Sequence, residues 1–255
     1  MRAVATIVIC LGLSVQTVQA RFQTIGDSDG WLVGGAVEVE SLPYPQADDL
    51  SVSLQPYVAY EWENLHIGVD DVSYDFFSTS DFLLTFTIQP RWSLSDEDDS
   101  PIFAGLDRDD AIEAGLILNY VLKEDLVSQW YWQSHYFQDV SSVYKGEYVT
   151  TELGYQREYA RHTLNFNVGL TYQSAELNHY LYGVNANEQT QSRSAFDAEE
   201  SVNAFIEFGV NYELMNRSLF VAKVNIDRLA HDLKKSPLLE STTQTSVLLG
   251  WVKLF

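Results

Sequence analysis

Alternation of apolar and polar residues over ten or more positions is the sequence feature that most limits the fold of this chain. In the segment 82–92 the even positions are apolar, while the odd positions include Thr85, Thr87 and Gln89. The segments 164–172 and 202–212 repeat the pattern. Because successive side chains of a strand point to opposite faces, this period of two predicts strands with one apolar and one polar face.

The same alternation recurs, with more interruptions, along the rest of the chain. We count about eleven candidate strands, at 31–39, 52–62, 64–74, 82–92, 112–120, 126–136, 149–155, 164–172, 202–212, 220–226 and 246–255. The phase changes near Asp70 and Asp71, which we interpret as a β-bulge. Since bacterial barrels have an even number of strands, one strand is missing from this count. The candidates for it are the segment before Trp31 and the segment 180–184.

Strand length separates a membrane barrel from a soluble β-sandwich. Sandwich strands average about five or six residues, whereas a tilted membrane strand needs roughly nine to eleven, as these segments have. Aromatic residues lie near the strand ends on the apolar face, as in an aromatic girdle: Trp31, Trp62, Trp92, Tyr120, Tyr136, Tyr155, Tyr172 and Tyr212. We therefore predict an all-β protein, a closed antiparallel transmembrane β-barrel of about 12 strands, with ten as the alternative. A soluble β-protein with an aromatic core is the competing interpretation.

The connections between these strands alternate between short and long. Short turns are expected at 123–125, near Tyr159-Ala160 and at 215–217, and longer polar loops at 94–110, 138–145, 175–200 and 228–242. In outer-membrane barrels the short turns face the periplasm and the long loops face outward.

The first twenty residues predict export. Arg2 precedes an apolar stretch too short to span a bilayer, and Val18 and Ala20 supply the small residues that a signal peptidase requires. We expect cleavage between Ala20 and Arg21, which leaves residues 21–255 as one barrel domain in the outer membrane of a Gram-negative bacterium. Cleavage also removes Cys10, the only cysteine, and with it any thiol chemistry.

Composition and residue spacing exclude several functions. The net charge of −21 argues against nucleic acid as a partner, because phosphate binding needs a basic face. The five histidines are scattered and show no metal-ligand spacing, so we expect neither a metal nor a cofactor. Ser134 and His135 are adjacent, so their side chains point to opposite faces of a strand and cannot form a nucleophile and base pair. We therefore expect a protein that is not an enzyme.

The polar strand face is rich in acids. Six glutamates are expected to face the lumen: Glu38, Glu61, Glu113, Glu152, Glu207 and Glu213. Arg91 and Lys223 are the few positive members of this face. Such a lining favours cations if water passes, whereas a barrel this small can also be filled by side chains. A narrow conducting lumen and a blocked lumen therefore both remain open.

The chain ends on a strand whose apolar face carries Leu249, Trp251 and Phe255. A terminal strand that closes on Phe is similar to the recognition signal of the barrel assembly machinery. Lys253 departs from that signal, since an aromatic residue is usual at this position.

Several segments together resemble the family of MltA-interacting protein and OmpV, in the same order along the mature chain. They are Gly105–Arg108 with Ala111–Leu116, Asp139-Val140-Ser141 followed by Gly146, Tyr182-Gly183-Val184, Ser236-Pro237-Leu238, and the terminal strand with Gly250 and Phe255. The resemblance implies an outer-membrane barrel surrounded by lipid. The founding member is described as a scaffold that links a murein-degrading lytic transglycosylase to a murein synthase, and other relatives as porin-like proteins, adhesins or immunogenic surface proteins. The family offers no catalytic motif, and fold transfers between its members more safely than role. The resemblance implies a scaffold that docks murein-remodelling enzymes. The alternatives are a narrow cation-favouring diffusion channel and a surface adhesin that acts through the long extracellular loops.

Overall fold

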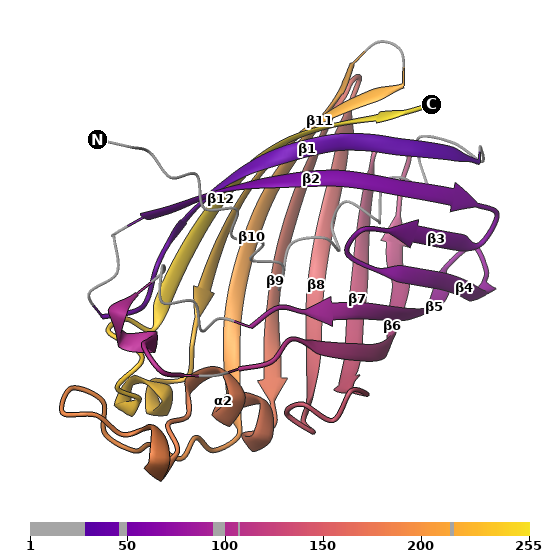
Figure 1. Cartoon of the computed structure of the whole chain (residues 1–255). Coiled ribbons are helices and arrows are strands. Elements are labelled where there is room, and N and C mark those ends of the chain that lie inside the picture. Colours follow the sequence, from indigo (N-terminus) through magenta and orange to yellow (C-terminus); the bar gives the residue numbers. More distant parts are fainter. Residues whose placement is uncertain (1–28, 46–49, 94–99, 107, 215–216) are drawn as a thin grey trace.

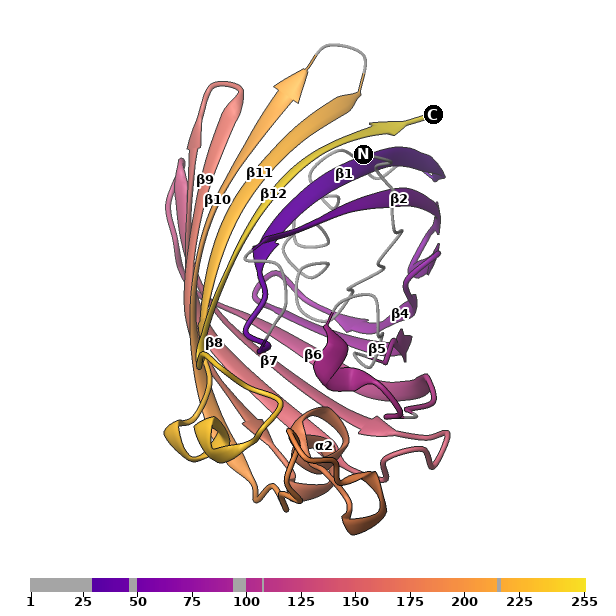
Figure 2. The same ribbon diagram turned by 60° about the vertical axis from the view of Figure 1, so that its left-hand side comes forward.

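Twelve antiparallel strands close into one barrel (Figures 1 and 2). The computed structural model describes residues 29–45, 50–93, 100–106, 108–214 and 217–255. Each strand pairs with its neighbours in sequence, and β1 pairs with β12 to close the wall. The prediction of a closed twelve-stranded antiparallel barrel is confirmed. No helix among the described residues is long and apolar enough to cross a membrane.

The strands of the wall are mostly eleven to fourteen residues long, with β3 and β4 much shorter. Their bounds are β1 (Gly30–Ser41), β2 (Leu50–Trp62), β3 (Leu65–Gly68), β4 (Val72–Ser78), β5 (Phe82–Arg91), β6 (Ala111–Glu124), β7 (Ser128–Asp139), β8 (Glu147–Tyr159), β9 (His162–Gln173), β10 (Ser201–Leu214), β11 (Ser218–Arg228) and β12 (Thr243–Leu254). Among the described residues, the connections contain one short α-helix, α2 (Ala175–Tyr182), and three 3-10 helices, η1 (Pro101–Phe103), η2 (Ala186–Glu188) and η3 (His231–Lys235).

The alternation in the sequence becomes an apolar outside and a polar inside. On β9, Phe166 and Val168 face outward and are exposed, while the alternate residues Asn165 and Asn167 are buried on the lumen face. Apolar side chains on the outside are stable because hydrocarbon, not water, surrounds the wall. A barrel suits this solvent because closure pairs the backbone groups that an open sheet edge would leave in lipid.

Two expectations about the strand count were wrong in detail. The segment 64–74 is not one bulged strand but two, β3 and β4, joined by a turn in which the Gly68 N–H donates to the Asp71 carbonyl at 2.7 Å. This hairpin supplies the twelfth strand. The segment 180–184 is not a strand, because its first part completes α2. The segment before Trp31 adds only Gly30 to β1, and residues 21–28 lie outside the described residues. The register shifts that do occur lie between Asp75 and Phe77 and between Val121 and Lys123.

The two ends of the barrel differ in their connections. At one end the turns are tight, and Glu63, Ala160 and Arg217 adopt left-handed backbone angles there. Trp31 and Phe255 lie at this same end, where the Phe255 N–H donates to the Trp31 carbonyl at 2.9 Å. The other end carries the long connections, as the sequence predicted. By the asymmetry of outer-membrane barrels, the tight turns face the periplasm and the long connections face outward.

The terminal strand has the geometry that its sequence predicted. Leu249 and Trp251 are exposed on the outer face of β12, opposite Val37 and Gly35 of β1. Phe255 follows the last strand residue and is also exposed. The role of this strand as an assembly signal stays a prediction. The predicted cleavage between Ala20 and Arg21 lies outside the described residues.

The outward face predicts where a charge is costly. Val168 lies in the middle of β9, and Val168→Arg should destabilise the barrel by about 2–4 kcal/mol, because a guanidinium at mid-membrane depth loses its hydration. Tyr172→Arg, near the end of the same strand face, should cost only about 0–1 kcal/mol. Urea-dependent unfolding from lipid vesicles measures both. Equal costs at the two positions would contradict the assigned membrane depth.

Candidate functional site

The lumen contains most of the predicted acidic lining. Glu38, Glu113, Glu152 and Glu207 are buried on the inner face of the wall, and Glu61 is half-buried. The sixth residue, Glu213, is exposed near the periplasmic end of β10. These acids are therefore spread over the length of the barrel and do not form a single cluster. Among the described residues, no group of three or more His, Cys, Asp or Glu side chains is placed to hold a metal ion.

A polar network runs along the inner face of the wall and links four strands. Lys223 of β11 forms an ion pair with Glu207 of β10 at 2.8 Å. Asn167 of β9 donates to Glu207 at 3.1 Å and accepts from the Tyr131 hydroxyl of β7 at 2.6 Å. Buried charges are tolerated when they are paired and hydrogen-bonded in this way. This part of the wall is therefore lined by paired, hydrogen-bonded side chains.

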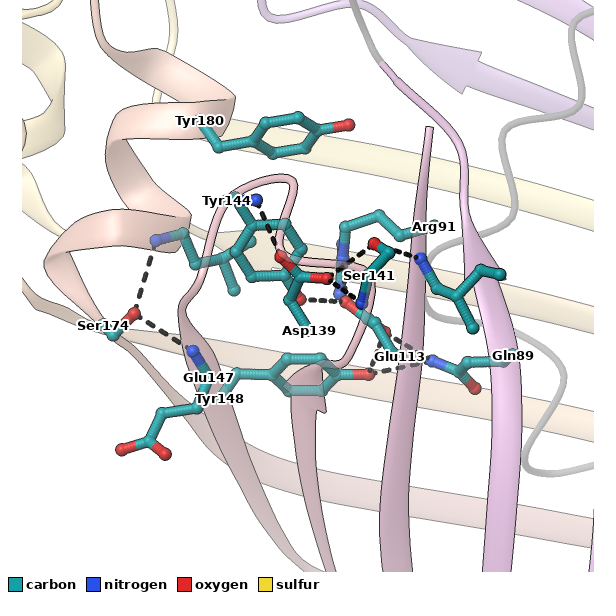
Figure 3. Close-up of polar contacts among 12 residues, drawn as sticks. Gln89, Arg91, Glu113, Asp139, Ser141, Tyr144, Glu147, Tyr148, Ser174 and Tyr180 are labelled. Atoms are coloured by element: carbon teal, nitrogen blue, oxygen red, sulfur yellow. Dashed lines mark hydrogen bonds and ion pairs between the residues drawn. The ribbon is translucent and has the colours of Figure 1, made fainter. Parts of the chain in front are cut away.

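A second network, at the outer end of the lumen, is centred on Glu113 (Figure 3). Glu113 is completely buried and pairs with Arg91 of β5. It accepts further hydrogen bonds from Gln89 at 2.9 Å, from the Tyr144 hydroxyl at 2.5 Å and from the Tyr148 hydroxyl at 3.3 Å. The Arg91 guanidinium also lies over the Tyr148 ring, 5.1 Å from its centroid. We call these five residues the Glu113 junction, because they join the wall to the loops above it.

The connection between β7 and β8 presents Tyr144 to this junction. Asp139 accepts four hydrogen bonds within the connection, two from Ser141 and one each from the backbone N–H groups of Tyr144 and Lys145, at 2.7–2.8 Å. Gly146 follows, and a Cβ there would lie 2.7 Å from the backbone nitrogen of Leu177 in α2. The Asp139, Ser141 and Gly146 pattern therefore fixes the loop and lets α2 pack closely against it.

Connections from all round the barrel meet above the lumen. We call residues 100–106, 174–200 and 229–242 the cap, and Figures 1 and 2 show them gathered at the long-loop end of the strands. One apolar cluster joins three of these segments to the β1–β2 connection, through Ile102, Phe103, Leu106, Val184, Leu238 and Tyr44. A second cluster joins α2 and η3 to inward-facing residues of the wall, including Phe137 and Tyr148. Each buried Leu or Phe of these clusters stabilises the cap by roughly 1.5–3 kcal/mol.

Two arginines hold the backbone of the cap in place. Arg108 pairs with Glu188 at 2.5 Å and also donates to the carbonyl oxygens of Tyr180 and Gly183. Arg193, almost fully buried, donates to the carbonyl oxygens of Ile102, Ala104 and Glu188 at 2.5–3.1 Å. A planar guanidinium with five donors suits this task, since it can satisfy several loop carbonyls at once.

Ionisation of the cap residues follows from these contacts. The hydrogen bond from Arg108 lowers the pKa of Glu188 to about 2. Burial raises the pKa of Tyr180 to about 12 and that of Tyr144 well above its usual value. Tyr180 and Tyr144 therefore stay protonated at neutral pH and can donate, to the Asp109 carbonyl and to Glu113 respectively.

Four of the five segments that carry the family resemblance come together in this region, although they are far apart in sequence, and the terminal strand with Gly250 and Phe255 lies apart from them. Ser236 donates to the Tyr182 carbonyl at 2.6 Å, Leu238 packs against Val184, and Arg108 reaches Gly183. Sequence reasoning placed Arg91 and Glu113 in the lumen but missed their partners Tyr144 and Tyr148, and it missed Arg193. A lone arginine in a polar loop gives no signal that it is buried.

A family model for the MltA-interacting protein MipA matches residues 33–255, which is most of the chain. The chain belongs to the MipA family. Among curated relatives, the outer membrane protein Omp26La of Vibrio anguillarum is 26% identical over 200 residues, covering 77% of this chain and 76% of the relative. The outer membrane protein OmpV of Vibrio cholerae serotype O1 is 26% identical over 196 residues, covering 72% and 71%. The protein is accordingly an outer-membrane barrel of the MipA and OmpV group.

Solved outer-membrane proteins are more distantly similar to this chain. The CymD monoaromatic hydrocarbon channel aligns with a TM-score of 0.46 at 9% identity, covering 98% of this chain and 94% of that one. The NanC porin aligns with a TM-score of 0.46 at 10% identity, covering 88% and 99%.

The Glu113 junction predicts a large loss of stability when its charge is removed. Glu113→Gln leaves the buried Arg91 guanidinium without its anion, so the free energy of unfolding should fall by about 3–5 kcal/mol. Glu176→Gln, on the exposed side of α2, should change it little. Adding Arg91→Gln to Glu113→Gln should restore part of the loss. A single-variant loss no larger than that of the Glu176 control would contradict the junction.

The Glu188 contact predicts that the cap loosens in acid. Because folding lowers the pKa of Glu188 from 4.5 to about 2, its contribution is fully present above pH 4.5 and is lost as the pH falls towards 2. Pepsin, which is active in this range, should cleave the cap progressively faster as the pH falls. Glu188→Gln should cleave readily throughout the range, with a flatter pH dependence. Identical profiles for the two proteins would contradict this role.

Proposed function

We propose that this protein is a non-enzymatic scaffold of the outer membrane that docks murein-remodelling enzymes at its periplasmic end. The observation that carries the proposal is the match, over 223 of 255 residues (33–255), to a family named for interaction with MltA. The partners would be a lytic transglycosylase and, as in the described founding member, a murein synthase.

The architecture is compatible with a scaffold. The outer mouth is covered by a cap with its own apolar clusters, and buried charges of the wall, such as Lys223 and Glu207, are paired with each other. A barrel whose main task is free diffusion of large solutes needs a clear aqueous channel, which is typical of 16 or more strands. A scaffold needs only a rigid anchor in the membrane and a surface that faces its partner.

The periplasmic end offers one such surface at the β6–β7 turn. Leu126 is fully exposed at the tip of this turn. Asp125 fixes the turn by accepting hydrogen bonds from the backbone N–H groups of Val127 and Ser128 at 3.0 and 2.8 Å. These hydrogen bonds lower the pKa of Asp125, so its carboxylate remains ionised at neutral pH. An exposed leucine on a rigid turn is a suitable apolar anchor for a periplasmic partner.

The scaffold proposal predicts specific capture of murein enzymes. Tagged protein isolated from detergent-solubilised envelopes should enrich lytic transglycosylases over an unrelated barrel of similar size. Leu126→Asp should reduce that enrichment, because a charge replaces the apolar contact. Ser192→Asp, exposed in the cap at the opposite end, is the matched control and should leave it unchanged. Absence of enrichment by the unaltered protein would exclude the scaffold role.

A narrow cation-favouring channel is the second candidate, and the buried lumen acids favour it. Glu38, Glu152 and Glu207 are all buried in the lumen, and Lys223 pairs with Glu207. If the cap gates such a channel, the unaltered protein should be silent in planar bilayers. Arg108→Ala with Arg193→Ala should then produce discrete, cation-favouring openings. Silence of both proteins would exclude the channel, while steady openings of the unaltered protein would count against a pure scaffold.

A further inference from the structure

One section of the barrel wall has no strand pairing among the described residues. β3 pairs with β2 only at Ala59–Trp62, and β4 pairs with β5 only as far as Ile88. Figure 1 shows β3 and β4 stopping well short of the ends of β2 and β5. The outer part of β2, Leu50–Pro56, and the outer part of β5, Gln89–Arg91, therefore face each other without the ladder that joins the rest of the wall. We call this section the notch.

Both edges of the notch carry a proline. Val58 accepts from the Val69 N–H at 3.1 Å on the β3 side of β2. Backbone groups of alternate residues in a strand point to the same neighbour, so Pro56 faces that side too, where β3 has ended. On β5, Phe82 accepts from the Thr79 N–H on the β4 side. By the same alternation Pro90 faces the β4 side, beyond the last pair at Ile88.

These two prolines are the only ones within the strands, since Pro43, Pro45, Pro101 and Pro237 lie in connections. Proline has no N–H to donate to a neighbouring strand and is confined to unpaired edges of sheets. Each edge of the notch thus lacks a donor at the place where another strand would need one. The sequence is therefore compatible with a permanent notch, and it disfavours the addition of a strand from a partner protein.

The β2 edge of the notch carries exposed aliphatic side chains on the outer face of the wall. Leu50, Val52 and Leu54 point outward along its β2 edge and are 57–61% exposed. Leu116, Val168 and Leu249 point outward between two fully paired strands and are only 41–49% exposed. The difference is expected when the neighbouring strand is missing on one side. The edge extends for about 20 Å at roughly 3.4 Å per residue, which is enough for much of one leaflet.

The notch also lies beneath the one outer connection that takes no part in the cap clusters. The other five outer connections contribute residues to the cap clusters or the Glu113 junction. The β3–β4 turn is a short hairpin turn set low in the wall. The cap obstructs the way out along the barrel axis, while the notch leads sideways into lipid. Polar side chains lie behind it, where Gln55 donates to Glu38 at 2.5 Å and Gln244 donates to Glu40 at 2.8 Å.

We propose that the notch is a lateral portal through which a single-chain amphiphile with a cationic head passes between the outer leaflet and the lumen. The aliphatic edge Leu50, Val52 and Leu54 would contact the apolar tail. The carboxylates behind the notch, among them Glu38 and Glu40, would attract the head group. This role is independent of enzyme docking at the periplasmic end.

Lipid access to the lumen tests the portal directly. Ser53 is buried on the lumen face of β2 behind the notch, and Thr150 is buried on the lumen face of β8 between two fully paired strands. A fluorescent bimane label on Ser53→Cys, in vesicles with brominated acyl chains, should be quenched several-fold more than the same label on Thr150→Cys. Val168→Cys, facing lipid, sets the full response. Quenching at Ser53 no greater than at Thr150 would overturn the portal. If the label prevents Ser53→Cys from folding, Ser51→Cys on the same face of β2 provides the same measurement within the notch.

The head group is tested in the same vesicles without brominated lipid. A spin-labelled single-chain amine should quench the Ser53 label at several-fold lower concentration than a spin-labelled carboxylate of equal chain length. Glu38→Gln with Glu40→Gln should remove that preference. Equal quenching by the amine and the carboxylate would overturn the assigned head group. A failure of either measurement would leave the capture of murein enzymes by the periplasmic end unaffected.

Discussion

Backbone hydrogen bonding in the absence of water is the constraint on which this structure depends. In hydrocarbon every unpaired peptide group is costly, and closing a sheet into a barrel pairs these groups between neighbouring strands. The period-two alternation meets this demand by giving each strand an apolar outer face and a polar inner face. The ladder of hydrogen bonds from β1 through to β12 then pairs the backbone N–H and C=O groups. Among the described residues, the section between Leu50–Pro56 and Gln89–Arg91 lacks this ladder, and each of its edges carries a proline.

The Glu113 junction connects this wall to the cap. A buried carboxylate needs compensating donors, and Glu113 receives them from two strands, β5 and β8, and from the β7–β8 connection through Tyr144. Asp139 holds that connection in place, and Gly146 allows α2 to pack against it. The cap is therefore part of the folded barrel and not a set of independent loops. An outer end closed in this way is consistent with a membrane anchor for periplasmic enzymes, with the notch as a side exit.

The sequence predicted the fold well because the two faces of each strand have different surroundings, and alternate residues point to different faces. The inward direction of Glu113, Glu152 and Glu207 could be predicted from alternation, and the closed barrel of about twelve strands from alternation together with strand length, the aromatic girdle and the even strand number of such barrels. The hairpin at Gly68–Asp71 could not be distinguished from a bulge, since both shift the phase of the pattern by a residue. Tyr144, Arg108 and Arg193 were beyond prediction as partners, because contacts between loops separated by dozens of residues leave no periodic signal. The notch also needed the register, which shows where β3 and β4 end.

Labelling of the lumen from the two sides of the membrane tests the capped barrel most directly. Thr150→Cys lies on the lumen face below the cap, and Ser192→Cys lies exposed on the outer surface of the cap. A polar, membrane-impermeant thiol reagent added outside intact cells should label Ser192→Cys rapidly and leave Thr150→Cys unlabelled. The same reagent should label Thr150→Cys once it is admitted to the periplasm. Rapid labelling of Thr150→Cys from outside would contradict a closed outer mouth and would favour an open channel.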